Sequence, residues 1–199
     1  MVISHNSGYV ADRRTAMRLD ILRSAAGEFR KRGFERAGMR EIAGGLGLTT
    51  GALYHQFKSK QELLYFCQDY SLDRMLEAGG RIRKEKATPG VRLRRLIEAQ
   101  MTCMLDELQG SAAHVEFAGL PPRLLKKIVA KRDRYERLMR GIVSQGMRSG
   151  AFRKRDPKLV TLAMLGAINW TIKWYRPEGR QSAAKIAREF ADYLIKGLA

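Results

Sequence analysis

Apolar residues recur at every third or fourth position along most of the chain, which is the spacing that places side chains on one face of an α-helix. Few stretches alternate between polar and apolar residues, and only five prolines occur among the 199 residues. This pattern predicts an all-α protein of about nine helices. The sharpest breaks between the expected helices fall at Pro89-Gly90, at residues 119–122 and at residues 176–179.

Residues 41–62, EIAGGLGLTTGALYHQFKSKQE, have the pattern of two very short helices joined by a glycine-rich turn. The apolar residues of the first helix share one face, and they are Met39, Ile42, Ala43 and Leu46. The glycines weaken and end this helix, because glycine costs about 1 kcal/mol inside a helix and accepts left-handed backbone. Thr49 is suited to cap the second helix, and Ser59 with Glu62 forms a capping box for a third. The layout is that of a helix-turn-helix.

The second of these helices is expected to point Leu53 into a small core and to leave its polar residues on the outer side. A phosphate-binding loop is one alternative for the glycines, but no strand-like run precedes them and the Gly-x-x-x-x-Gly-Lys pattern is absent. An ordinary helical hairpin that happens to be rich in glycine is the other alternative. The segment alone does not distinguish it from a DNA-reading motif.

The run from residue 18 to residue 64 resembles the DNA-binding domain of the tetracycline-repressor (TetR) family. Its matching elements are a first helix of the form Ile-Leu-x-x-Ala-Ala-x-x-Phe, then Gly33-Phe34, Ile42-Ala43, Gly51-x-Leu53-Tyr54-x-x-Phe57, and Lys60 with Leu63-Leu64. The chain departs from the family at Ala37-Gly38, where a threonine or serine usually caps the second helix. Glycine costs only a few tenths of a kcal/mol relative to serine at such a position, so we expect Gly38 to cap the helix.

The resemblance implies a homodimer that places two reading helices in successive major grooves of a palindromic operator, about 34–36 Å apart. By position in the family motif, the residues that approach base edges or the adjacent backbone are Thr50, Gly51, Ala52 and Tyr54. Phosphates would be gripped by Thr49, His55 and Lys60, with a further contact from Arg40. His55 could instead be an ordinary surface histidine, although polar residues on a reading helix mostly position the phosphates.

The same resemblance divides the chain into a disordered arm (residues 1–12), a reading domain (13–60) and a helical ligand-binding and dimerisation domain (61–199). A helix that starts at Lys60 joins the two folded parts, so an effector that shifts its far end would move the reading head. A coupling of about 1–3 kcal/mol would weaken operator binding roughly 5- to 150-fold. The chain is therefore expected to be a repressor that a small effector releases from DNA.

The net charge of +18 is divided between the two parts of the chain. Residues 1–60 hold 11 Lys and Arg against 5 Asp and Glu, a net of +6, which suits the neutralisation of phosphates. Residues 61–199 hold 27 against 15, a net of +12. This second excess is either a solvated surface that steers the protein toward DNA or the binding site of an anionic ligand.

The penultimate helix, PKLVTLAMLGAINWTIKWY from residue 157 to residue 175, is apolar nearly all round and must be buried over most of its circumference. Ala163, Gly166 and Ala167 would allow another helix to approach it closely. In the TetR family the last two helices pair with their copies in a four-helix bundle, and the apolarity of this helix agrees with that arrangement. Burial inside the core of a monomer is the alternative.

The predicted effector pocket consists of apolar and aromatic residues of the larger domain, namely Met101, Met104, Leu105, Leu108, Phe117, Tyr135, Trp170 and Trp174. For most of them taken singly, plain core packing is the simpler interpretation. The C-terminal stretch also resembles the TetR subgroup that senses acyl-coenzyme A thioesters of lipid, sterol or branched-chain catabolism, through Asn169-Trp170, Trp174-Tyr175, Pro177 and Gly179. Coenzyme A carries phosphates and an adenine, so Lys173, Arg176 and Arg148 are candidate contacts. A small apolar or drug-like effector is the alternative.

Catalysis is not expected, because no motif places a nucleophile beside a base and one of the three histidines lies in the reading helix. Cys67 and Cys103 lack the spacing of metal ligands and suit the reduced thiols of a cytoplasmic protein, so no cofactor is expected besides the effector. The first residues lack the apolar stretch of a signal peptide, and residues 159–172, the longest uncharged run, are too few to span a bilayer. An acyl-coenzyme A-processing enzyme and an architectural nucleic-acid binder that uses bulk positive charge are the rival classes.

Overall fold

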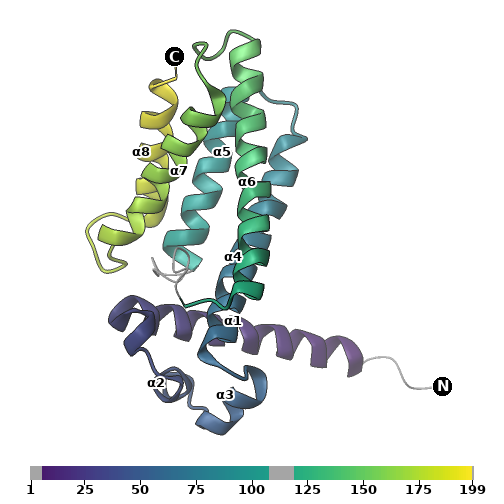
Figure 1. The fold of residues 1–199 in the computed structure, drawn as a ribbon, viewed down its shortest axis with the longest axis vertical. Helices are drawn as coiled ribbons and strands as arrows, with labels where there is room; N and C mark the ends of the chain where they lie inside the picture. The colour runs from purple at the N-terminus through teal and green to yellow at the C-terminus, as the bar shows by residue number, and fades with distance from the viewer. Residues whose placement is uncertain (1–5, 108–118, 199) are drawn as a thin grey trace, which may run out of the picture.

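The computed structural model describes residues 6–107 and 119–198, with side chains from residue 16 to residue 105 and from residue 119 onward. Within these ranges the chain forms eight α-helices and one five-residue π-helical turn, and it contains no β-strand (Figure 1). The expected all-α fold is confirmed. Residues 108–118, between the expected fifth helix and the break at residues 119–122, lie outside the described residues.

Three helices build the reading domain at the lower end of the molecule in Figure 1: α1 (Asn6–Arg36), α2 (Met39–Gly44) and α3 (Thr50–Gln56). Residues 6–12 belong to α1, which corrects the expectation that they form part of a disordered arm. The first twenty residues contain no proline, and the single glycine at Gly8 costs about 1 kcal/mol, which is too little to end the helix. Residues 1–5 lie outside the described residues.

The reading domain has its own apolar core, which packs α1 against α2, α3 and the start of α4 (Lys60–Arg83). Leu53 of α3 is completely buried in this core, as its predicted inward orientation requires. Leu120 and Ile128, at the start of α6 (Pro122–Arg148), also belong to it. A Cβ atom on Gly119 would overlap with the ring of Phe34, so the chain that enters α6 packs directly against the end of α1.

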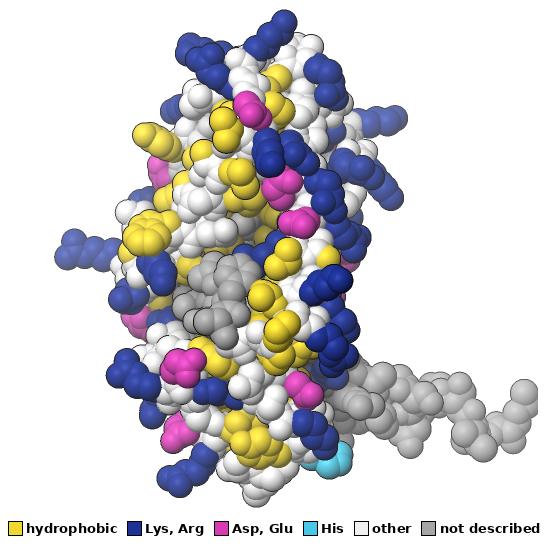
Figure 2. Space-filling model, viewed as in Figure 1, with side chains coloured by type: hydrophobic (Ala, Val, Ile, Leu, Met, Phe, Trp, Pro, Cys, Tyr) yellow, Lys and Arg dark blue, Asp and Glu magenta, His cyan; other side chains and the backbone are white. Residues whose placement is uncertain are grey.

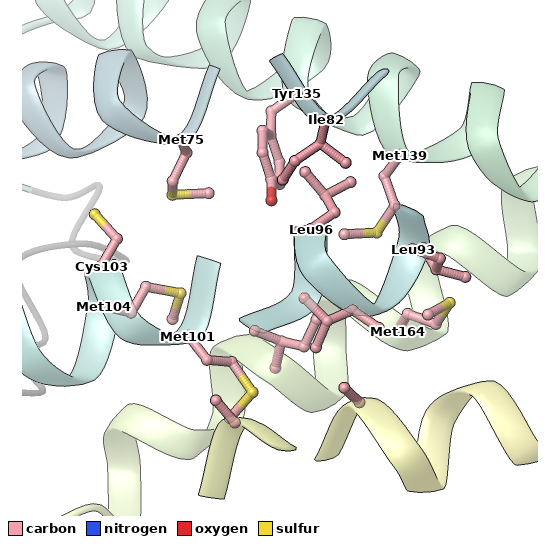
Figure 3. Packing of buried hydrophobic residues seen from close by; sticks show 14 of the residues in the cluster. Met75, Ile82, Leu93, Leu96, Met101, Cys103, Met104, Tyr135, Met139 and Met164 are labelled. Atoms are coloured by element: carbon pink, nitrogen blue, oxygen red, sulfur yellow. The ribbon is translucent and has the colours of Figure 1, made fainter. Parts of the chain in front are cut away.

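The larger domain is a bundle in which α4 and α6 run side by side along the length of the molecule (Figure 1). α5 (Pro89–Thr102) packs against α8 (Ala183–Lys196), and α7 (Pro157–Trp174) packs against α6. The π-helical turn η1 (Cys103–Glu107) continues α5 without a break. Methionine supplies much of the shared core, through Met75, Met101, Met104, Met139 and Met164 (Figure 3).

One face of α7 carries apolar side chains that the described part of the chain does not cover. Leu159 is 65% exposed, Leu162 47% and Trp170 64%. Gly166 lies on the same stripe, and a Cβ atom there would meet no atom within 4 Å among the described residues. The helix that was expected to be buried over most of its circumference is therefore buried on one side only within a single chain, which leaves this stripe available to a second copy.

Candidate DNA-reading surface and effector cavity

α3 is held at the tip of the reading domain with its outer face open to solvent (Figure 1). Thr49 caps it, since the Thr49 Oγ1 accepts a hydrogen bond from the Ala52 N–H at 3.1 Å. Gly47 has a φ of 66°, the left-handed backbone that the preceding turn requires. Tyr54 is 45% exposed, while Leu53 beside it is completely buried. The turn, the cap and the orientation of α3 are as predicted.

The residues predicted to contact DNA lie at this end of the molecule. Those that are exposed are Arg40, Thr49, Gly51, Tyr54 and His55. Thr50 and Ala52 are half-buried. A Cβ atom on Gly51 would have the Thr49 Oγ1 at 3.9 Å as its nearest neighbour, so no packing among the described residues requires a glycine there. This open space agrees with the prediction that Gly51 allows a close approach of α3 to a partner, and the DNA contacts stay a prediction.

Lys60, predicted to contact a phosphate, is engaged by the backbone of the protein itself in this structure. Its Nζ donates hydrogen bonds to the carbonyl oxygens of Phe34, Glu35 and Ala37, at 2.7, 2.9 and 3.1 Å. A lysine ammonium has three protons to donate, and all three are used here. Lys60 therefore binds the backbone of the short turn that follows the kink at Gly33, at the end of α1. Lys58, exposed directly after α3, was not singled out and is better placed for a phosphate.

The departure from the family at Gly38 is accommodated locally. α2 starts at Gly38 with no side-chain hydrogen bond from the cap, as a glycine cap requires. A Cβ atom at Gly38 would overlap with the carboxylate of Glu41, so Glu41 occupies the space where a threonine or serine side chain would lie. A carboxylate in the first turn of a helix is stabilised by the helix dipole. The prediction that this helix survives its glycine cap is confirmed.

A cavity of about 60 Å³ lies inside the larger domain between α4, α5, α6 and α7. Its lining residues are Leu72, Met75, Gln100, Arg132, Tyr135, Leu165 and Asn169. Of the predicted pocket residues, Tyr135 lines this cavity and Met101, Met104 and Leu105 are buried in the core near it. Leu108 and Phe117 lie outside the described residues.

The cavity wall is more polar than the predicted pocket. Gln100 is 1% exposed, and its Nε2 donates to the Asn169 Oδ1 at 3.4 Å. Burial raises the pKa of the Tyr135 hydroxyl above its usual value, and the nearby Cys103 raises it further, so the hydroxyl stays protonated. Burial also lowers the pKa of Arg132, to about 10, which still leaves a cation at neutral pH. Sequence reasoning did not place Gln100, Arg132 or Asn169 in the pocket, because polar residues are usually assigned to the surface.

The tryptophans and cations of the predicted ligand set do not join this cavity. Trp170 and Trp174 lie on the outer side of α7, 64% and 45% exposed, and the Trp174 ring is 6.0 Å from that of Phe190 in α8. Lys173 and Arg176 are exposed at the lower end of α7, whereas Arg148 ends α6 at the top of the bundle (Figure 1). Neighbours in the sequence of a helix point in different directions, so a single pocket does not collect all of these residues.

Lys and Arg side chains cover both domains and gather along the edge of the bundle that α4 and α6 form (Figure 2). Lys131 of α6 pairs with Asp69 and Asp73 of α4, with N–O distances of 2.6 Å to each. The exposed cations of α6 without an ion pair among the described residues include Lys126, Lys127, Arg134 and Arg137. Part of the +12 excess therefore lies along α6, where it suits a solvated surface that steers the protein toward DNA.

Over residues 6–107 and 119–198, no three His, Cys, Asp or Glu side chains are grouped so as to hold a metal ion. No helix of the same ranges has both the length and the apolar character needed to cross a bilayer. Cys67 and Cys103 are both buried, and neither forms a disulfide among the described residues.

Two protein-family models match the chain. One, described as bacterial regulatory proteins, tetR family, matches residues 21–65, which include α2 and α3. The other, described as the tetracyclin repressor-like C-terminal domain, matches residues 86–198, which is more than half of the chain.

Individual proteins agree with these matches over nearly their whole length. The HTH-type transcriptional repressor KstR2 of Mycobacterium tuberculosis is 26% identical over 201 residues, covering 95% of this chain and 96% of that protein. The TetR family regulator PfmR of Thermus thermophilus has a crystal structure that is 34% identical with a TM-score of 0.80, covering 90% and 98% of the two chains. The structure of AibR in complex with isovaleryl coenzyme A and operator DNA is 28% identical with a TM-score of 0.73, covering 91% and 97%.

Proposed function

This chain belongs to the tetracycline-repressor (TetR) family of DNA-binding transcriptional regulators, and from that premise we propose that it is a repressor which a small effector releases from a palindromic operator. The observation that carries the proposal is the exposed reading helix α3, joined through α4 to a buried cavity in the larger domain. Because the proposed operator is part of the chromosomal DNA, the repressor would act in the cytoplasm.

Operator recognition requires two copies of α3, because a helix of seven residues spans too few base pairs to specify a site alone. The uncovered apolar stripe of α7 supports a homodimer, since burying such side chains is favourable by about 25 cal/mol per Å² of apolar surface. Gly166 at the centre of that stripe would let two copies of α7 approach closely. Tyr193 of α8 is 81% exposed and is a further large side chain that the described residues leave uncovered.

The effector acts on the reading head through α4. Lys60 fixes the start of α4 to α1, and Leu72 and Met75, farther along the same helix, line the cavity. A ligand larger than the present cavity must separate α4 from α6, which would displace the head. A difference of about 1–3 kcal/mol between the two arrangements is enough to weaken operator binding roughly 5- to 150-fold.

An acyl-coenzyme A thioester is the effector class that we favour. The AibR structure, which is similar over nearly the whole chain, holds isovaleryl coenzyme A. The cavity suits part of an acyl group, and Lys173 and Arg176, exposed outside the cavity, are the candidate contacts for the phosphates of a coenzyme. A small apolar or drug-like effector is the second candidate, because a cavity of about 60 Å³ lined partly by Leu72, Met75 and Leu165 needs no coenzyme to fill it.

The test starts from an operator selected out of random duplexes with the purified protein. Affinity for that duplex and for a scrambled one is then measured by fluorescence anisotropy at fixed salt. Acyl-coenzyme A thioesters and the matching free acids are titrated into the complex, first with the wild type and then with Arg176→Ala and Trp174→Ala. We expect thioesters to release the DNA, and the removal of a charge-assisted hydrogen bond to cost about 1.5–3 kcal/mol, or roughly 10- to 150-fold in effector affinity.

Two results would contradict parts of this proposal. Equal affinity for the selected and the scrambled duplex would indicate an architectural binder that uses bulk charge. Equal potency of free acids and thioesters would mean that the coenzyme is not recognised, which favours the small apolar effector.

A further inference from the structure

We propose that the cavity between α4, α5, α6 and α7 receives the tip of an effector that carries an oxygen function, a hydroxyl or a ketone, and that Tyr135 and Gln100 hold this oxygen. The inference rests on the effector-responsive function proposed above. It adds the chemical group that the buried end of the effector must carry.

Two buried polar atoms on the cavity wall have no hydrogen-bond partner among the described residues. Tyr135 is 3% exposed and Gln100 is 1% exposed, and the unpaired atoms are the Tyr135 hydroxyl and the Gln100 Oε1. The other end of the Gln100 amide is engaged, since its Nε2 donates to the Asn169 Oδ1 at 3.4 Å and lies 3.7 Å from the Met104 Sδ. In Figure 3 the Tyr135 hydroxyl points inward, on the side of Met75. Each such atom costs about 1–3 kcal/mol when it is buried unpaired, so two beside one cavity indicate a bound partner.

The two atoms offer complementary chemistry. The Tyr135 hydroxyl has a proton to donate, and the Gln100 Oε1 has lone pairs to accept one. A ligand hydroxyl could accept from Tyr135 and donate to Gln100, whereas a ketone could only accept from Tyr135. A hydrocarbon tip would leave both atoms unpaired. Arg132, a half-buried cation on the same wall, further favours the negative end of a carbon–oxygen dipole.

The size and depth of the cavity identify the part of the effector that reaches it. A volume of about 60 Å³ holds a small functional group, and a water molecule takes about 30 Å³ of liquid. Leu72 and Met75 on the wall are 1% and 3% exposed, so the cavity lies deep in the bundle. A coenzyme with several phosphates cannot follow to that depth unpaired. The oxygen must therefore belong to the far end of the acyl group and not to the thioester.

The first test compares ligands that differ only in this oxygen. Octanoyl-, 7-oxooctanoyl- and 7-hydroxyoctanoyl-coenzyme A are titrated into the full chain by calorimetry. We expect the two oxygenated thioesters to bind roughly 5- to 150-fold more tightly than octanoyl-coenzyme A, the factor that follows from pairing one buried donor. Tyr135→Phe should remove most of this preference. Gln100→Met should remove the advantage of the hydroxyl over the ketone and keep that of the ketone over the hydrocarbon.

A second arm needs no coenzyme. Thermal denaturation is followed with 2-octanone and with its isosteric hydrocarbon, 2-methyl-1-octene, and only the ketone should raise the melting temperature appreciably. If thioesters fail to bind but 2-octanone is preferred, the coenzyme part of the proposed function is wrong and the chemistry of the cavity is upheld. If neither arm distinguishes oxygenated from plain ligands, the present inference is overturned even where thioesters release DNA.

A third measurement tests the unpaired hydroxyl without any ligand. Tyr135→Phe should leave the melting temperature unchanged or raise it, because the substitution removes a buried group that has no partner among the described residues. Tyr65→Phe is the matched control, since the Tyr65 hydroxyl donates to the Asp69 Oδ1 at 2.9 Å. We expect that control to lower the melting temperature by about 2–4 °C, the shift that follows from losing roughly 1 kcal/mol. An equal loss in Tyr135→Phe would mean that ordered water already satisfies the hydroxyl, and the inference would fall.

Discussion

Lys60 of α4 and Phe34 of α1 are joined twice: the Lys60 Nζ donates to the Phe34 carbonyl oxygen at 2.7 Å and lies 4.6 Å from the centre of the Phe34 ring. The start of α4 is thereby fixed to the end of α1. Because α4 also lines the effector cavity, this junction is where a movement of α4 would reach the reading head.

Lys60→Met should lower the stability of the protein and leave the salt dependence of operator binding unchanged. The substitution leaves three carbonyl oxygens without their donor, at a cost of about 1–3 kcal/mol, but it removes no phosphate-binding group. Lys58→Met is the matched control, because Lys58 is exposed beside α3. It should keep the stability and reduce the slope of log affinity against log salt by about 1 for each phosphate that is no longer neutralised. If Lys60→Met reduced the salt dependence and Lys58→Met lowered the stability instead, Lys60 would be assigned to a phosphate contact.

Tyr54→Ala should abolish the preference for the operator without unfolding the chain. Tyr54 is 45% exposed on α3, and the core of the reading domain is made by its neighbour Leu53. The affinities of wild type and variant for operator and scrambled duplex are compared at one salt concentration, and circular dichroism monitors the fold. A variant that still discriminates between the duplexes would show that base reading does not depend on this side chain.

Gly166→Glu should convert the dimer into monomers or insoluble chain. A side chain at Gly166 meets no atom within 4 Å among the described residues of a single chain, so the fold of one protomer tolerates it. Between two copies of α7 it would block close approach and bury an unpaired charge. Gly141→Glu, at an exposed position of α6 that is equally open, is the control and should leave the dimer intact. Sedimentation velocity measures both, and an undisturbed dimer in Gly166→Glu would place the interface elsewhere.

Cys67 should make the protein less stable in alkali. Burial raises the pKa of its thiol to about 12, whereas the thiol of an unfolded cysteine has a pKa of about 8.5. Between these two values the folded chain keeps a proton that the unfolded chain has lost. The stability from the neutral thiol is therefore complete below about pH 8.5 and falls as the pH rises, by up to about 1.4 kcal/mol per pH unit. Denaturant unfolding between about pH 9 and about pH 11 should show a steeper decline for wild type than for Cys67→Ala. If the free energy of unfolding fell equally with pH in the wild type and in Cys67→Ala, the raised pKa of Cys67 would be contradicted.

The reading domain could be predicted from the sequence because its constraints are local. A cap at Thr49, glycines in the turn and an inward Leu53 each depend on residues a few positions away. The role of Lys60 could not be found in this way. Its three acceptors lie more than twenty residues earlier in the chain, and they are backbone atoms that any residue would supply.

The effector cavity depends on packing between four helices, which sequence patterns do not specify. Arg132 nevertheless had a detectable signal, because it falls on the apolar stripe of α6 between Ile128 and Tyr135. A charged residue inside an otherwise apolar stripe is either paired or functional. Trp170 and Trp174 show the opposite error: they follow the apolar pattern of α7, yet they lie on its outer side and do not line the cavity.

The burial of Leu120 and Ile128 in the core of the reading domain means that two helices, and not one, support the head. The start of α4 and the start of α6 both pack into its core, and the ion pairs of Lys131 with Asp69 and Asp73 link the two helices. A reading domain that is attached to both α4 and α6 tilts when one of these helices slides along the other. A reading domain attached to α4 alone would move together with that helix. We therefore expect the reading domain of each protomer to tilt. The angle of α3 in the major groove would then change together with the distance between the two reading domains.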